Sequence, residues 1–223
     1  PQEVCSGNSN LCPSDLGQPP TNCEPYACTG ANGCRSSCIT DAECGAAPGS
    51  VCVTGLCVTA KLVFLTSATY ANATSFGAMA GADSACQTLA TSAGLSGTFK
   101  AWLSSAPGAT TEAATRLTHA TVPYVLRNKT RVAMNWNDLI DGTLLAPISA
   151  TEAGTVIQAS NVWTGTTPAG AAAPSCSGWM NAGINVTNAT VGSSSQTNSN
   201  WTQMSSLLLC RPPSGYRFYC LEQ

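Results

Sequence analysis

Cysteine is the residue type whose number and spacing imply the most chemistry in this chain. Of its 13 cysteines, nine lie within the first 57 residues: Cys5, Cys12, Cys23, Cys28, Cys34, Cys38, Cys44, Cys52 and Cys57. A segment this short with few large apolar residues cannot be held together by burial alone, so we expect cross-links to stabilise it. Disulfides persist in oxidising surroundings, which predicts an extracellular or cell-surface protein. The start at Pro1 rather than Met favours secretion through a signal peptide that has been removed.

Zinc is the alternative partner for so many cysteines. Zinc sites usually have close ligand pairs such as CxxC, often completed by histidine, and residues 1–58 contain neither. The spacing therefore favours disulfides. In CITDAECGAAPGSVCVTGLC, which reads as two short strands joined by turns, we predict the pairs Cys38–Cys52 and Cys44–Cys57. Because nine is odd, one cysteine must be free, pair with the second half of the chain, or pair with another chain.

Residues for catalysis are scarce. Acid–base chemistry usually draws on histidine or paired carboxylates, and His119 is the only histidine. The chain has no GxSxG, HExxH or phosphate-binding glycine motif. Oxidised cysteines are not nucleophiles. We therefore interpret His119 as a structural residue and predict that the protein is not an enzyme.

One short motif suggests calcium. Residues 136–138 read WND, a sequence that binds calcium and sugar in C-type lectins. Calcium needs six or more oxygen ligands, and no acidic cluster lies near Asp138 and Asp141. Both residues precede Gly142, which also fits an ordinary turn. We therefore predict no cofactor and no metal, with calcium as the alternative, and keep Trp136, Asp138 and Asp141 as candidate ligand-binding residues.

Aromatic and amide residues offer other contacts. The five tryptophans could stack on sugars, although packing in the core is the default interpretation. Trp201, within a Ser/Asn/Thr-rich segment, is the best candidate for an exposed contact. Five Asn-x-Ser/Thr sequons permit glycosylation, and those at 185–202 predict a surface loop: Asn72, Asn128, Asn185, Asn188 and Asn200.

Composition limits the classes of partner. Charged residues make up only 9% of the chain, against about a quarter in ordinary soluble domains. The net charge of −2 gives no field that would attract nucleic acid. No apolar stretch reaches the roughly 20 residues that a membrane-spanning helix needs. Proteins near neutrality tend to associate, so we expect a homo-oligomer.

Three segments must position these residues. Residues 1–22, rich in Pro, Ser, Asn and Gly, read as an extended arm. Residues 23–58 form the disulfide-rich module, and residues 61–223 form the larger domain. The fold class predicted is α+β, with few helices and several short antiparallel strands.

Within the larger domain, hydrophobic spacing predicts the individual elements. The predicted elements are a strand in KLVFLTS, a helix over 75–94 ending at Gly94, a strand over 98–104, a short helix over 111–118, a hairpin in VPYVLRNKTRVAM turning near Asn128 and Lys129, a loop-rich stretch over 146–202, and a final strand in RFYCLE. Arg127 and Arg131 flank the hairpin turn, and we interpret them as solvated charges of a strand edge rather than as an anion site.

Residues 81–105, GADSACQTLATSAGLSGTFKAWLSS, closely resemble the opening helix and strand of the endostatin domain of basement-membrane collagens. The resemblance continues in order through about residues 61–223, in LVFLTS, VPYV, NWNDLIDG, NVWTG, CSGW, Cys210 and YCLE. The cysteine-rich front module makes the chain more similar to bacterial cell-surface proteins with endostatin-like domains than to a collagen fragment.

The resemblance implies a C-type-lectin-like fold, with a mixed sheet, one long helix and extensive loops. It also implies two nested disulfides, Cys86–Cys220 and Cys176–Cys210. The histidines of the family's zinc site are missing here, where only His119 occurs. The family's heparin-binding arginines are missing too, since only Lys100 holds a matching basic position.

Two functions follow as expectations. The first is a non-enzymatic extracellular protein that binds a protein or glycan at a cell surface, in adhesion, through loops chiefly over 143–205. The alternative is a self-assembling subunit of a filament, tube or surface coat, which the low charge, the arm and the odd cysteine favour. Calcium-dependent glycan binding is a second alternative.

Overall fold

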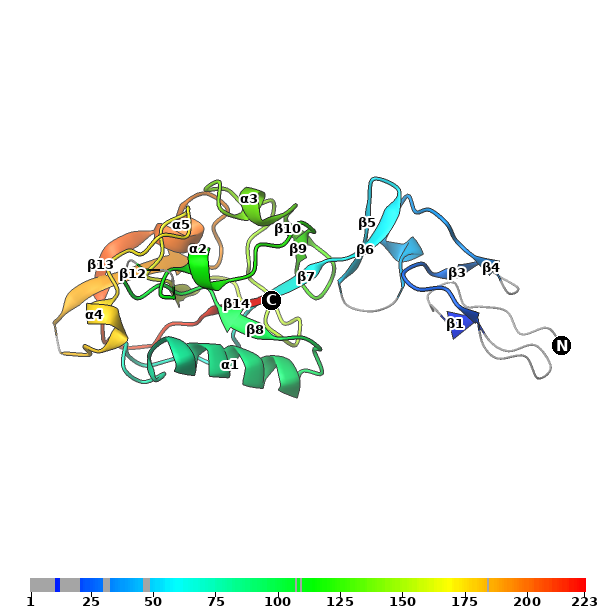
Figure 1. Ribbon diagram of the computed structural model, residues 1–223. Helices are drawn as coiled ribbons and strands as arrows, with labels where there is room; N and C mark the ends of the chain where they lie inside the picture. Colours follow the sequence, from blue (N-terminus) through cyan, green and yellow to red (C-terminus); the bar gives the residue numbers. More distant parts are fainter. Residues whose placement is uncertain are drawn as a thin grey trace. The chain divides into compact units, whose positions relative to one another are not determined.

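The computed structural model describes residues 11–12, 21–29, 33–45, 49–106, 108, 110–183 and 185–223. The chain divides into two compact units, Pro1–Ala60 and Lys61–Gln223, which Figure 1 shows in blue to cyan and in cyan to red. Strands and helices are mixed, so the α+β class is confirmed. Most of the arm predicted over 1–22 lies outside the described residues.

The N-terminal unit consists of short hairpins. The paired strands are β1 (Leu11–Cys12) with β2 (Thr21–Asn22), β3 (Cys28–Thr29) with β4 (Gly33–Cys34), and β5 (Ser50–Val53) with β6 (Leu56–Thr59). Thr54 and Gly55 join β5 to β6 with φ of 48° and 87°, which is the positive-φ geometry that suits the twist of a two-residue hairpin. The two strands predicted in this segment are confirmed.

Disulfides connect these hairpins. The bridges with both sulfurs described are Cys23–Cys34, Cys38–Cys52 and Cys44–Cys57. The two pairs predicted here are therefore confirmed. Cys28 is also disulfide-bonded. The prediction that one of the nine cysteines has no partner within this segment stays a prediction. It depends on Cys5 and Cys12, and the side chains of both lie outside the described part of the chain.

The C-terminal unit contains a mixed five-stranded sheet in the order β10-β9-β7-β14-β8. Its strands are β7 (Lys61–Leu65), β8 (Phe99–Ala101), β9 (Tyr124–Val125), β10 (Arg131–Ala133) and β14 (Tyr219–Glu222). Neighbouring strands run antiparallel except β7 and β9. The strands predicted in KLVFLTS, TFKAWLS and RFYCLE are thus confirmed, as is the hairpin, in which Lys129 has φ of 68°.

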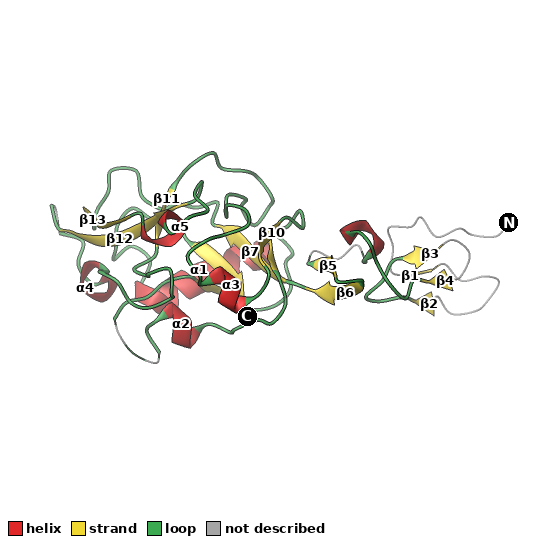
Figure 2. Ribbon diagram, turned by 90° about the horizontal axis from the view of Figure 1, so that it is seen from above, coloured by secondary structure: helices red, strands yellow, loops and turns green. Residues whose placement is uncertain are grey.

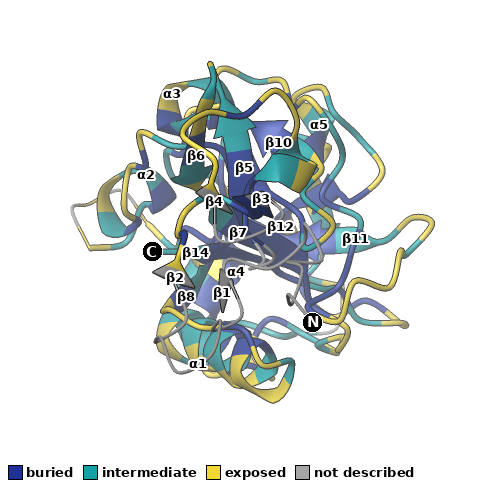
Figure 3. Ribbon diagram, turned by 90° about the vertical axis from the view of Figure 1, so that its right-hand side faces the viewer, coloured by how far each residue is buried: buried dark blue, intermediate teal, exposed yellow. Residues whose placement is uncertain are grey.

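Helix α1 (Ala78–Ser92) lies beside β8 (Figure 1), and the disulfide Cys86–Cys220 joins it to β14. Its residues Ala82, Cys86 and Ala90 are fully buried and recur at every fourth position, so they form one face of the helix. Figure 3 shows the exposed residues of α1 on the side away from the strands. Gly81 has no room for a side chain, because a Cβ atom there would lie 1.6 Å from the Phe76 carbonyl oxygen.

Among the described residues of this unit, four short helices lie between loops, and Figure 2 draws them in red. They are α2 (Ala113–Arg116), α3 (Trp136–Leu139), α4 (Cys176–Trp179) and α5 (Asn200–Gln203). The short helix predicted over 111–118 is therefore confirmed. A three-stranded antiparallel sheet completes the unit, in the order β11 (Asn161–Trp163), β12 (Thr187–Ser193) and β13 (Ser205–Leu209).

The prediction of a surface loop over 185–202 is wrong for residues 187–193, which form a strand. β12 occupies Thr187–Ser193 and pairs with a strand on each side. Ala189 and Val191 are fully buried. The sequence TNATVGS mixes Asn, Gly and Ser, which favour turns, with Thr and Val, which favour strands, and pairing on both edges with burial of two side chains decides for the strand.

Helix α4 is a single left-handed turn. Cys176, Ser177, Gly178 and Trp179 have φ between 53° and 69°. This conformation costs about 1–2 kcal/mol for each residue other than glycine. The turn is fixed by the disulfide Cys176–Cys210 and by Trp179, which is fully buried and donates from Nε1 to the Ser104 carbonyl oxygen at 2.9 Å.

Candidate functional site

Trp201 lies in the core, so the prediction that it forms an exposed contact is wrong. The side chain is fully buried. Its ring packs against Trp102, with centroids 5.0 Å apart, and against Tyr219, with centroids 5.6 Å apart. Helix α5 turns this residue inward from a polar segment, because the apolar ring gains more from burial than from a place on the surface.

The two acidic candidates stabilise turns. Asp138 accepts a hydrogen bond at Oδ2 from the Met134 backbone N–H at 2.6 Å. Asp141 accepts at Oδ1 from both the N–H and the hydroxyl of Thr143, each at 2.8 Å. These contacts are typical of the turn roles of aspartate. Among the described residues, neither carboxylate belongs to a group of three metal-ligand side chains.

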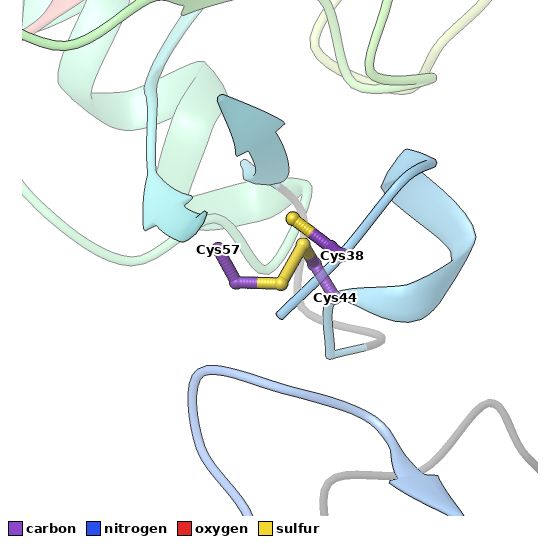
Figure 4. A group of neighbouring side chains, drawn as sticks. All are labelled: Cys38, Cys44 and Cys57. Carbon is purple, nitrogen blue, oxygen red and sulfur yellow. A yellow bond between two sulfur atoms is a disulfide. The ribbon is translucent and has the colours of Figure 1, made fainter. Parts of the chain in front are cut away.

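The group of metal-ligand type that the described residues do contain is Cys38, Cys44 and Cys57, whose sulfurs lie within 4.8 Å of one another. Figure 4 shows the bond between the sulfurs of Cys44 and Cys57, and Cys38 is bonded to Cys52. Metal binding requires thiolates. The three sulfurs belong to two adjacent disulfides and none of them is a thiolate, so this cluster is not a metal site as it stands.

Trp136 and Asn137 of the WND segment line a cavity of about 250 Å³. The other lining residues are His119, Ala120, Thr121 and Asn135. His119 and Trp136 form its aromatic part. Their rings are stacked, with centroids 4.2 Å apart and planes inclined by 11°. Trp136 is buried, whereas His119 is exposed. We call this cavity the His119 pocket.

Hydrogen bonds fix the backbone around His119. The Tyr124 hydroxyl donates to the Thr118 carbonyl oxygen and accepts from the Ala120 N–H, each at 3.2 Å. Burial raises the pKa of Tyr124, and the hydrogen bond from Ala120 lowers it by less. The hydroxyl therefore stays neutral and keeps both contacts. The Trp136 N–H donates to the Ala120 carbonyl oxygen at 2.9 Å, which joins the two walls of the pocket.

The polar groups of the pocket are an imidazole, a hydroxyl and two amides, from His119, Thr121, Asn135 and Asn137. The Nε2 atom of His119 lies 2.6 Å from the Ala114 carbonyl oxygen. Because a carbonyl only accepts, Nε2 carries a hydrogen and donates to it. Asn137 is exposed, and its amide has no partner in the described structure. This arrangement can bind a neutral polar ligand, but its lining residues include no carboxylate or nucleophile.

The remaining predicted residues are spread over the surface of this unit. The sequon residues Asn128, Asn185 and Asn188 are exposed, while Asn72 and Asn200 are partly buried. Arg127 is not a solvated edge charge, because it donates to the carbonyl oxygens of Ala93 and Glu152 at 3.1 Å and 2.8 Å. The interpretation given from the sequence is therefore wrong for Arg127.

Trp136 is thus the one residue that sequence analysis placed in a candidate site and that lines the His119 pocket. His119 and Asn137 were missed as binding residues. No signal in the local sequence could have identified His119. Its ring stacks on Trp136, which is 17 positions away in the chain, and this contact appears only in the folded structure.

Comparisons with known proteins show no family for this chain. No family model matches the sequence, and no curated protein matches it. In the described residues, no helix has both the length and the apolar character needed to cross a membrane.

Proposed function

We propose that this protein is a non-enzymatic extracellular or cell-surface protein that binds a partner, in adhesion, through a C-type-lectin-like domain over residues 61–223. Three features support the proposal. The first and last strands of the unit, β7 and β14, are paired. One long helix is joined to β14 by Cys86–Cys220. The disulfides of both units are consistent with an oxidising location.

The class of ligand that we propose is inferred from the side chains that line the His119 pocket. An imidazole ring backed by Trp136 offers an apolar surface, and the unpartnered amide of Asn137 offers hydrogen bonds beside it. Sugars are recognised by that combination, because aromatic rings pack on their C–H faces while amides bind their hydroxyl groups. The ligand proposed is therefore a neutral glycan.

We expect His119→Ala and Asn137→Ala each to weaken binding to the glycans that the full chain selects on an array by at least tenfold, about 1.4 kcal/mol. His119→Ala removes the exposed ring, and Asn137→Ala removes the amide. Affinity for the selected glycan is measured by isothermal titration calorimetry, with calcium and with a chelator, which also tests calcium dependence.

Gln196→Ala is the matched control, since it removes a partly buried amide that does not line the pocket. It should leave affinity unchanged. An array without any bound glycan in either condition, or equal affinity for the three variants and the original chain, would contradict glycan binding at this pocket.

The alternative is a self-assembling structural subunit, and the edge strand β13 supports it. β13 has one partner strand, β12, among the described residues. Leu207 on it is 72% exposed. The segment Ser205–Leu209 contains no charged residue and no proline. Such residues usually protect an edge strand from pairing with another chain. The net charge of −2 adds little repulsion between copies.

If copies associate through β13, Leu207→Lys should shift the protein from polymer or oligomer to monomer, because it places a charge where two edges would meet. Sedimentation velocity and electron microscopy measure the change. Leu145→Lys is the control, since Leu145 is also exposed, at 59%, but is not on this strand. An original chain that sediments as a monomer, or a Leu207→Lys variant that keeps the original size, would refute assembly at this edge.

A further inference from the structure

A second cavity of the C-terminal unit, of about 560 Å³, combines one cation with two amides and an apolar floor. Asn72, Asn185 and Arg211 supply the polar groups, and Leu209 and Pro212 supply the apolar part. None of its lining residues is acidic. We call it the Arg211 pocket.

Cys210 brings the three polar residues together. Its carbonyl oxygen accepts from the Ala73 N–H at 2.8 Å, and its N–H donates to the Val186 carbonyl oxygen at 2.8 Å. Asn72, Asn185 and Arg211 are the chain neighbours of these three residues, so each is held beside the others. The disulfide Cys176–Cys210 anchors the same point. The pocket is therefore formed before a ligand arrives, which lowers the entropy cost of binding.

Arg211 has no partner in the described structure, unlike other cations of its unit. Lys61 pairs with Glu222, and Arg116 pairs with Asp83. Arg127 and Arg217 donate to backbone carbonyl oxygens. No hydrogen bond or ion pair among the described residues involves the guanidinium of Arg211. Its five N–H groups are thus available to a ligand.

The two amides add donors. The Oδ1 atom of Asn72 accepts from the N–H and the hydroxyl of Thr74 at 3.1 Å and 2.9 Å, which leaves its NH₂ group to donate. The amide of Asn185 has no partner in the described residues. A guanidinium and two NH₂ groups form a set of donors with a net positive charge. Such a set favours an anion with several acceptor oxygens.

We propose that the Arg211 pocket binds the carboxylate of a small organic acid whose neutral body packs on Leu209 and Pro212. A guanidinium matches a carboxylate in a bidentate geometry. An apolar wall with a few convergent polar groups is typical of small-ligand sites. The carboxylate can belong to an acidic sugar or to an amino acid derivative. This site shares no residue with the His119 pocket, so either can fail alone.

The test uses the full disulfide-bonded chain, made without N-glycans because Asn72 and Asn185 belong to sequons. Two acids, methyl glucuronide and N-acetyl-leucine, are titrated against ¹⁵N-labelled protein. Their uncharged counterparts, methyl glucoside and N-acetyl-leucine amide, serve as controls. We expect at least one acid to shift the backbone amide resonances of Asn72, Asn185 and Arg211, while its uncharged counterpart does not. The acid that binds identifies the source of the carboxylate.

Arg211→Gln should weaken that binding by at least tenfold, and Arg211→Lys should fall between, because a lysine keeps the charge but loses the bidentate geometry. Lys129→Gln removes the same charge from a residue outside the pocket and should bind as the original chain does. Unchanged spectra outside the pocket show that each variant is folded. The proposal is overturned if neither acid shifts these resonances, if the uncharged counterparts shift them equally, or if Arg211→Gln binds as well as Lys129→Gln.

Discussion

Replacing Cys86 and Cys220 together by alanine is expected to lower the free energy of unfolding of the C-terminal unit by about 5 kcal/mol, the value that the chain-entropy relation gives for so long a loop. The two cysteines are 134 residues apart. Without the bridge, the unfolded chain gains the freedom of that whole loop. Both sulfurs are also fully buried between α1 and β14, so the folded state loses packing as well.

Urea unfolding followed by tryptophan fluorescence measures this loss in the full chain, because Trp102, Trp136, Trp163, Trp179 and Trp201 all belong to the Lys61–Gln223 unit. Replacing Cys176 and Cys210 is the comparison. That bridge spans 34 residues, so the same relation gives a smaller loss of about 4 kcal/mol. The expectation fails if removing Cys86–Cys220 costs less than removing Cys176–Cys210, or if it costs nothing measurable.

Trp102→Ala is expected to cost about 3–5 kcal/mol, the usual range for deleting a large ring from a core. Trp102 is fully buried at the centre of an aromatic cluster. Its ring centroid lies 5.0 Å from that of Trp201 and 5.9 Å from that of Trp136. Its Nε1 donates to the Thr202 hydroxyl at 2.7 Å. The deletion therefore removes ring packing and one of the two hydrogen bonds of the Thr202 hydroxyl, which still donates to the Thr166 carbonyl oxygen.

Trp102→Phe separates the two contributions, because it keeps an aromatic ring and removes the donor. We expect about 0.5–1.5 kcal/mol for it, the net contribution of one hydrogen bond, because the Thr202 hydroxyl still donates to the Thr166 carbonyl oxygen at 3.1 Å. The same fluorescence assay applies, with circular dichroism as a second probe because one tryptophan is lost. Equal losses for the alanine and phenylalanine variants would show that packing on Trp136 and Trp201 contributes little.

Elements with a strong local pattern could be predicted from the sequence. Helix α1 repeats small buried residues at every fourth position, and β7 is a continuous apolar run. The hairpin of β9 and β10 is marked by polar turn residues between apolar strands. In the N-terminal unit the pairs Cys38–Cys52 and Cys44–Cys57 suit two short strands with a turn. Cys86–Cys220 and Cys176–Cys210 followed from the family resemblance, since spacing alone does not decide connectivity.

Elements that depend on distant contacts could not be predicted. β12 is a strand because β11 and β13 pair with it, and its own sequence mixes residues that favour turns with residues that favour strands. Trp201 is buried because its ring packs against Trp102 and Tyr219, whereas its polar neighbours in sequence suggested an exposed position. Both pockets join segments that are far apart in sequence, as Cys210 does for Ala73 and Val186. Local periodicity contains no information on such contacts.

The place of β14 in its sheet determines the order in which the C-terminal unit can be made. β14 is the last strand of the unit to leave the ribosome, yet it lies between β7 and β8. A nascent chain that ends at Ser205 lacks the strand between β7 and β8, and it contains Cys86 and Cys176 but not Cys210 or Cys220. Oxidation of Cys86 at that stage could yield only a non-native disulfide, because its native partner is absent. The native bridge Cys86–Cys220 can form only after the last strand of the chain is present.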